Sequence, residues 1–168
     1  MSAPDYCEPI VGWRSWRAHM RDGEAYLVSV FHRVRWPYGQ PLEGACESWR
    51  VPWRRRHRHP APSDDCLCGI YAGTFDIACA FAPVLPPRTR SVYAVVGTVA
   101  LWGDVAEYSE GWRASYAYPR ELYLISYGSH RAAETTAFAR SLERYQVPVT
   151  TIRAARRRDV SSALRAAA

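Results

Sequence analysis

The segment that decides the fold reads Cys46-Glu-Ser-Trp-Arg-Val-Pro-Trp53, then Arg54-Arg-Arg-His-Arg-His-Pro-Ala-Pro62, then Ser63-Asp-Asp-Cys-Leu-Cys-Gly-Ile-Tyr-Ala72. It holds three of the five cysteines and two of the five histidines of the chain. Its prolines interrupt any regular helix or strand, so we expect an irregular loop. A long irregular segment inside a compact domain needs something to hold it.

The spacing of the cysteines and histidines in this segment predicts a structural metal site. Thiolates and neutral imidazoles are the ligands that Zn²⁺ takes in closed tetrahedral sites, often with two ligands close together and two reached across a loop. His57 is the competing imidazole, and the sequence leaves open whether Cys7 takes part. The predicted zinc ligands are Cys46, His59, Cys66 and Cys68.

Three other interpretations use the same side chains. An iron–sulfur cluster would also bind the thiolates, but three clustered cysteines with one histidine suit zinc better. A cysteine with a histidine partner could instead be a catalytic nucleophile. The simplest alternative is that the cysteines are ordinary small buried residues, as we expect for Cys79 within its apolar surroundings.

Length and composition indicate one folded domain. The chain has 168 residues, of which 48% are hydrophobic and 13% aromatic. These values exclude wholesale disorder. No window approaches the roughly 18 apolar residues that a membrane span needs. The first residues, Met1 to Glu8, lack the pattern of a signal peptide. We therefore expect a cytoplasmic protein without membrane contact, whose thiols stay reduced.

The arginine-rich loop raises a second functional hypothesis. The net charge is +6, and all 22 basic residues are arginines. This bias is typical of a GC-rich genome, which favours a solvated loop. Arginine with tryptophan can also bind phosphates and stack on bases. Alternatively, the repeated Trp-Arg pairs could form cation–π contacts over a sheet. The candidate nucleic-acid contacts are Arg54, Arg55, Arg56, Arg58, Trp49 and Trp53.

The rest of the chain is rich in β patterns. Gly12 to Ala18 and Ala25 to Val34 flank an Asp-Gly dipeptide, which predicts a hairpin. Gly69 to Phe75 resumes a strand, whereas residues 76–81 fit either a helical turn or a strand end. Ser91 to Tyr108 is the strongest strand, with Gly97 and Gly103 as bulges or close-packing points. We expect Val95, Val99 and Leu101 to be core residues.

Two more strands and a helix follow. Trp112 to Tyr118 should end at Pro119, and Glu121 to Tyr127 forms the next strand. Ser129 is the expected cap of a helix whose apolar face carries Phe138, Leu142 and Tyr145. Residues 147–152 read as an edge strand, and a basic tail leads into a poor final helix.

These patterns predict an α+β fold. It is a mostly antiparallel sheet or small barrel with a metal-held loop and a C-terminal helix. Residues 1–128 form the β-rich domain with the Cys/His loop at 46–68. Residues 129–168 contribute the helix, a short strand and the basic tail, packed on the same domain.

Four motifs together resemble an uncharacterised family of small proteins from GC-rich bacteria. The motifs are Gly12-Trp-Arg-x-Trp-Arg17, Cys66-x-Cys-Gly-Ile-Tyr-Ala72, Leu101-Trp-Gly-x-Val105 and Gly111-Trp-Arg-Ala-x-Tyr-Ala-Tyr-Pro119. The resemblance spans roughly residues 11–125. It implies a bacterial protein with one integral fold and, because no activity is known for the family, implies no function.

The sequence therefore favours a non-enzymatic, zinc-stabilised binding or adaptor module with a protein partner. The first alternative is a nucleic-acid-binding protein that uses the arginine-rich loop. The second is an enzyme that depends on the Cys/His cluster. The motifs of nucleotide-binding loops, dinucleotide-binding folds, serine hydrolases and zinc proteases do not occur in the chain.

Overall fold

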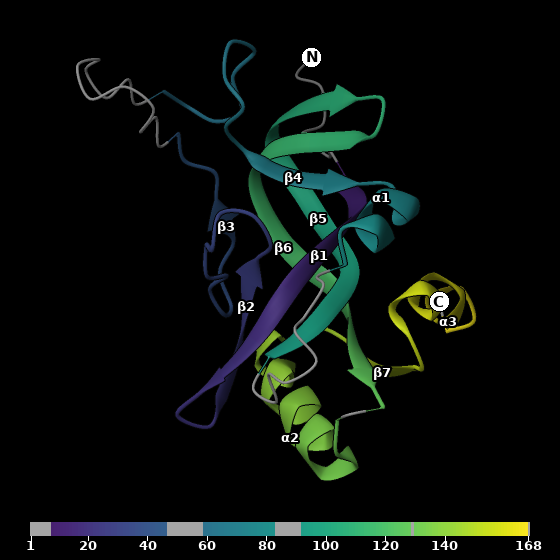
Figure 1. Cartoon of the computed structure of the whole chain (residues 1–168). Helices are drawn as coiled ribbons and strands as arrows, with labels where there is room; N and C mark the ends of the chain where they lie inside the picture. The colour runs from purple at the N-terminus through teal and green to yellow at the C-terminus, as the bar shows by residue number, and fades with distance from the viewer. Residues whose placement is uncertain (1–7, 47–58, 83–91, 129, 168) are drawn as a thin grey trace, which may run out of the picture.

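A seven-stranded sheet with three short α-helices makes up the structure. The computed structural model describes residues 8–46, 59–82, 92–128 and 130–167 (Figure 1). The strands are β1 (Ile10–Arg21), β2 (Glu24–Ser29), β3 (Leu42–Glu43), β4 (Ile70–Gly73), β5 (Val92–Tyr108), β6 (Gly111–Tyr127) and β7 (Val149–Ala154). The helices are α1 (Phe75–Ala80), α2 (Ala132–Leu142) and α3 (Val160–Arg165), with single 3₁₀ turns η1 (Glu143–Tyr145) and η2 (Arg157–Asp159).

The sheet is built on the long antiparallel hairpin of β5 and β6, each of 17 residues. β1 pairs with β5, and β2 lies outside β1. Near the turn of the hairpin, β4 pairs with the first residues of β6. β4 also pairs with β1, where Gly73 lies opposite Trp13. The pairings β1–β5–β6–β4–β1 thus form a closed circuit, with β4 crossing the upper part of the sheet in Figure 1.

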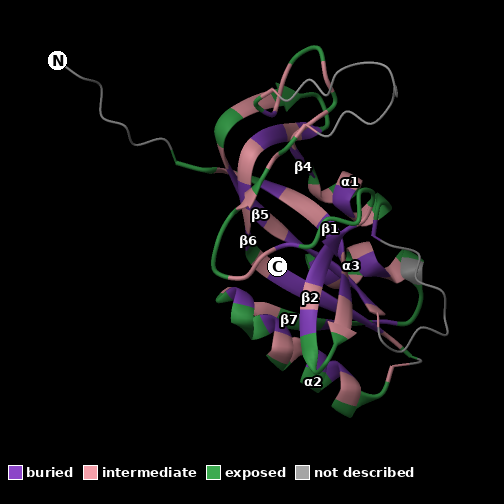
Figure 2. Ribbon diagram, turned by 90° about the vertical axis from the view of Figure 1, so that its left-hand side faces the viewer, coloured by how far each residue is buried: buried purple, intermediate pink, exposed green. Residues whose placement is uncertain are grey.

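Alternating side chains place a separate core on each face of the sheet. On β6, Leu122 and Leu124 face one core, whereas Tyr123 and Ile125 face the other. This alternation is the pleat of a strand that is covered on both sides. α2 packs on the first face, while α1 and α3 cover the second (Figure 1). The buried residues run along the strands in Figure 2.

The structure confirms the predicted fold class. All pairings are antiparallel except that between β6 and the parallel edge strand β7. Val95, Val99 and Leu101 are fully buried, as expected. The Asp-Gly dipeptide makes the β1–β2 turn, where Asp22 and Gly23 both have positive φ. None of the helices in the described ranges is long and apolar enough to cross a membrane.

Several strand boundaries differ from the prediction: β1 is longer at both ends, and β4 ends at Gly73 rather than Phe75. Pro119 does not end its strand, because the register between β5 and β6 shifts there and Arg120 bulges out between Pro119 and Glu121. A bulge tolerates a residue without an N–H group. β2 ends at Ser29 rather than Val34, because the backbone turns back through a hydrogen bond from Ser29 N to the carbonyl of Val34.

The structure also decides the ambiguous segment of residues 76–81. Residues 75–80 form α1, whose first turn is capped by the hydroxyl of Thr74, so the helical alternative is the correct one. α2 begins after Arg131, which gives no side-chain cap. Ser129, the expected cap, lies outside the described residues. Cys79 packs against the second core, as predicted.

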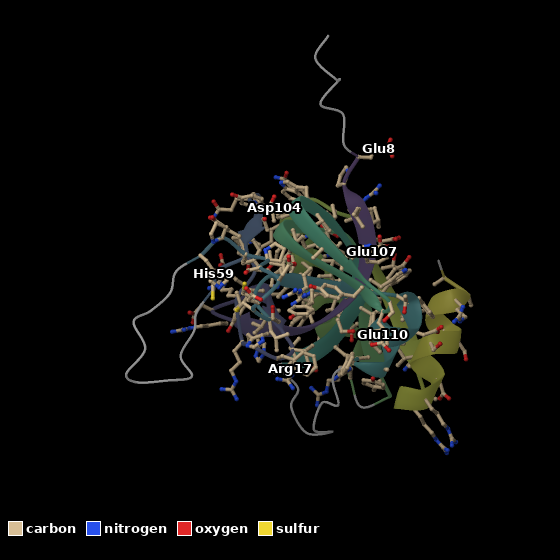
Figure 3. All side chains as sticks on the ribbon, turned by 90° about the horizontal axis from the view of Figure 1, so that it is seen from above. Glu8, Arg17, His59, Asp104, Glu107 and Glu110 are labelled. Carbon is tan, nitrogen blue, oxygen red and sulfur yellow. The ribbon has the colours of Figure 1, made fainter. Side chains whose placement is uncertain are left out.

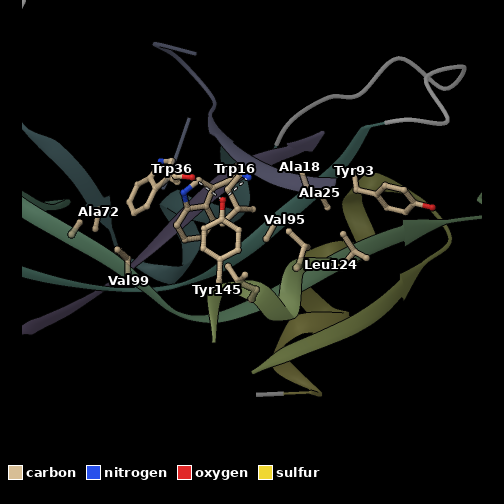
Figure 4. Close-up of a cluster of buried hydrophobic side chains, with 14 of the residues drawn as sticks. Trp16, Ala18, Ala25, Trp36, Ala72, Tyr93, Val95, Val99, Leu124 and Tyr145 are labelled. Carbon is tan, nitrogen blue, oxygen red and sulfur yellow. Dashed lines mark hydrogen bonds between the residues drawn. The ribbon is translucent and has the colours of Figure 1, made fainter. Parts of the chain in front are cut away.

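Tyr145 connects three separate segments inside the first core. Its fully buried hydroxyl accepts a hydrogen bond from Leu27 N and donates one to the carbonyl of Trp36, both at 2.9 Å. Figure 4 shows the Tyr145 hydroxyl pointing toward Trp16 and Trp36. Burial raises the pKa of the Tyr145 hydroxyl, so it stays protonated and able to donate. The tyrosine thereby fixes β2 and the Trp36 segment against η1.

We predict that Tyr145→Phe lowers the free energy of unfolding by about 1–3 kcal/mol, because two buried backbone groups lose their partner. Tyr26→Phe is the matched control, since the Tyr26 ring stacks on His19 and its hydroxyl makes no hydrogen bond within the described residues. Chemical denaturation measures both. Equal stability of the two variants would contradict the assignment.

Candidate metal centre

The structure brings together the four side chains that the sequence predicts as ligands. The ligand atoms of Cys46, His59, Cys66 and Cys68 all lie within 4.8 Å of one another. Sγ of Cys46 is 3.6 Å from Sγ of Cys66, and Sγ of Cys68 is 3.9 Å from Nδ1 of His59. Figure 3 shows His59 at the side of the molecule with sulfur atoms beside it. This group could hold a metal ion.

The ends of the long loop meet at the cluster, which explains how distant residues become neighbours. The backbone of Ala45 forms an isolated antiparallel bridge with Pro60, next to Cys46 and His59. Just before it, Gly44 N donates a hydrogen bond of 2.6 Å to the carbonyl of Ser115 on β6. The first two ligands are therefore positioned by backbone contacts to the sheet and to each other.

The Cys-x-Cys turn places the other two ligands. The N–H of Cys66 bonds to the carbonyl of Ser63 at 3.1 Å, which closes a turn before the pair. Gly69 then takes a φ of 115°, a conformation that favours glycine. A Cβ there would lie 3.3 Å from Cβ of Pro62 and 3.4 Å from Cβ of Arg113. Only a glycine lets the chain pass so tightly from Cys68 into β4.

The thiols differ in how readily they lose a proton. Burial raises the pKa of Cys46 to about 11 and also raises that of Cys68. The backbone N–H of Cys68, which bonds to the sulfur of Cys66, lowers the Cys66 pKa to about 7. Because a metal binds thiolates, its binding here must displace protons from Cys46 and Cys68. Metal affinity should therefore fall as the pH falls.

His59 is oriented by its neighbour. Its Nδ1 lies 2.8 Å from the carbonyl oxygen of Pro60, and a carbonyl only accepts hydrogen bonds. Nδ1 therefore carries the proton in this contact, which leaves the lone pair on Nε2. The same contact raises the pKa of His59. A backbone carbonyl that holds one ring nitrogen is typical of metal-binding histidines.

Arg113 lies directly behind the cluster, and sequence reasoning did not identify it as a functional residue. Its side chain on β6 is 3% exposed. One guanidinium nitrogen donates to the carbonyls of both Cys66 and Cys68, at 3.2 Å for the latter, and the other donates to the Tyr108 hydroxyl. The signals in the sequence were its place in the Gly111–Pro119 motif and in one of the repeated Trp-Arg pairs.

Two arginines of the Trp-Arg pairs do form cation–π contacts, but not with the tryptophan next to them in the sequence. Arg14 lies over the ring of Trp36, with 5.2 Å between Cζ and the ring centroid. Arg113 lies over Tyr108 at 4.8 Å and over Tyr71 at 5.9 Å. These arginines do stack on aromatic rings, but the rings come from other parts of the chain, because sequence neighbours on a strand point to opposite faces.

Several predicted positions fall outside the described residues. They are the candidate nucleic-acid contacts Trp49, Trp53, Arg54, Arg55, Arg56 and Arg58, together with the alternative ligands His57 and Cys7. The nucleic-acid hypothesis therefore stays a prediction.

Comparison with known proteins adds no relative. No protein-family model matches the chain, and neither a curated protein nor a solved structure matches it. Inference about function thus depends on the geometry of the cluster itself.

We predict that His59→Ala weakens metal binding far more than His57→Ala does. Removing a ligand should exceed the roughly 10–100-fold loss that follows the removal of a supporting residue outside the ligand set. Competition with a chromophoric chelator measures the affinity of each purified variant. The choice of His59 is wrong if His57→Ala is the variant that loses the metal.

Proposed function

We propose that this chain is a non-enzymatic binding module whose fold is held by one Zn²⁺ on Cys46, His59, Cys66 and Cys68. The observation that carries the proposal is the convergence of three sulfurs and one imidazole within 4.8 Å. Four protein ligands fill a tetrahedral zinc site and leave no position for a reacting water, as in structural rather than catalytic sites.

The spacing of the ligand atoms favours a single tetrahedral ion. With zinc–sulfur bonds near 2.3 Å, neighbouring sulfurs of a tetrahedron lie about 3.8 Å apart. The separation of 3.6 Å between the sulfurs of Cys46 and Cys66 is close to this value. An iron–sulfur cluster places several atoms between its protein ligands and so needs a wider arrangement.

The position of the cluster supports a structural role for the metal. Cys46 follows β3, Cys68 precedes β4, and both strands pair with β6. β3 and β4 have only two and four residues and therefore few ladder hydrogen bonds of their own. One ion shared between the segments would fix both to the sheet, and its binding free energy would become folding free energy.

We infer a protein as the partner because two apolar side chains next to the predicted metal ligands are exposed. Leu67, between the two close ligands, is 82% exposed, and Tyr71 at the start of β4 is 42% exposed. The Tyr71 hydroxyl bonds to the carbonyl of Leu67 at 2.7 Å, so the two residues are held together. Apolar side chains that a rigid loop presents to solvent suit contact with another protein.

The metal is tested first. Purified protein should contain about one zinc per chain by elemental analysis, and Cys68→Ser should lose the metal together with much of the thermal stability. Cys79→Ser is the matched control, because this half-buried cysteine lies on α1, outside the cluster. Metal-free wild-type protein that melts cooperatively at an unchanged temperature would refute the proposal.

The class of partner is tested next. Leu67→Glu should keep the zinc but lose any protein that co-purifies with the wild type. Val11→Glu, which changes an exposed apolar site on β1, should keep that protein.

Oligonucleotide binding tests the alternative function, nucleic-acid binding. A wild-type affinity tighter than about 10⁻⁶ M at physiological salt, reduced by neutralising Arg54, Arg55, Arg56 and Arg58, would replace the protein partner by nucleic acid.

A further inference from the structure

Arg113 is a buried cation held in place by neutral groups. The described contacts of its guanidinium are the carbonyl oxygens of Cys66 and Cys68, the hydroxyl of Tyr108 and the faces of two tyrosine rings. These oxygens accept hydrogen bonds from the guanidinium but carry no formal charge. The arginine is therefore well bonded and still electrically uncompensated.

No carboxylate neutralises this arginine in the described parts of the chain. The ion pairs found there involve Arg21, Arg131, Arg144, Arg158 and Arg165, all of which are on the surface. Arg113, by contrast, is almost completely buried. A buried charge is costly unless an opposite charge lies close to it. The side chain donates to the backbone carbonyls of two predicted metal ligands, so the metal centre is a candidate for that charge.

The charge of the centre follows from its ligands. Three thiolates contribute −3, a neutral imidazole contributes nothing, and a divalent cation contributes +2. The sum is −1, which matches the single positive charge of Arg113. We propose that Arg113 is the counter-charge of the metal centre, and that it favours a divalent ion bound by three thiolates. This inference rests on the proposed zinc site.

Because the charge of Arg113 balances a centre of charge −1, the arginine should favour some metal ions and ligand sets over others. A monovalent soft ion such as Cu⁺ would leave the same ligand set at −2, and one arginine would then compensate only half of the charge. A ligand set of two thiolates and two imidazoles with a divalent ion would be neutral and would gain nothing from the arginine. Arg113 is thus a positioning and specificity-determining residue, since it touches the backbone of the ligands and not the ion.

Charge at position 113 is tested with Zn²⁺ in competition with a chromophoric chelator. Arg113→Met, which removes the charge and keeps an extended apolar chain, should weaken zinc binding about 10–100-fold. Arg113→Lys, which keeps the charge, should retain most of the affinity. Tyr145→Phe is the control for general destabilisation, because it loosens the core near α2 without touching the metal loop; its zinc affinity should equal that of the wild type.

A change of ligand charge makes the test decisive. Cys46→His converts the centre to two thiolates and two imidazoles, a set that also binds structural zinc and is neutral with it. In this background Arg113→Met should change zinc affinity less than about threefold, against the 10–100-fold loss in the wild-type background. If Arg113→Met fails to fold with the native ligands, it should fold with zinc in the Cys46→His background.

Three results would overturn the proposal. They are unchanged zinc affinity in Arg113→Met, equal losses in the Met and Lys variants, and an equal loss with either ligand set. Each of them leaves the zinc site itself intact, because the wild type would still bind one metal per chain. Absence of zinc from the wild type would instead refute the site. Cobalt spectra of every variant, read for thiolate-to-metal charge transfer, confirm that three thiolates, or two with Cys46→His, bind the ion.

Discussion

The pairing of β5 with β6 is the constraint on which the rest of the structure depends. The two strands approach closely at Gly97, where a Cβ would lie 2.0 Å from the carbonyl oxygen of Glu121. Beyond that point the register shifts twice, between Thr98 and Val99 and between Trp102 and Val105. Such irregularities bend a strand and increase its twist. One half of the hairpin therefore stays in a covered sheet, and the other half turns toward β4.

The two halves have different roles. The half near α2 and α3 is buried on both faces and supplies most of the packed interior. The half near β4 lies beside the cluster of cysteines and His59. Arg113, on this half of β6, donates a hydrogen bond to the backbone carbonyl of Cys68. Packing holds the first half. The second has short strands and a long loop, so a bound ion would supply the restraint that a core supplies elsewhere.

The sequence allowed the ligand set and the general fold to be predicted, because both depend on local signals. Cysteines and a histidine at metal-binding spacing, an Asp-Gly turn and long runs of β-branched residues need no tertiary information. Pro119 was misjudged, because a bulge created by the partner strand accommodates it. Arg113 was missed for a related reason. Its burial arises from a loop more than 40 residues earlier in the chain, which no local pattern reveals.

The bridge between Ala45 and Pro60 has a consequence for how this protein can vary. The bridge joins the chain just before Cys46 to the chain just after His59. Backbone contacts to the sheet and across the bridge therefore position these two ligands. The free energy of closing a loop grows only slowly with its length, by about 0.6 kcal/mol for each doubling. The segment could therefore be lengthened, shortened or exchanged at small cost. The bridge thus allows the positions of the ligands to be fixed independently of the length of the chain between them.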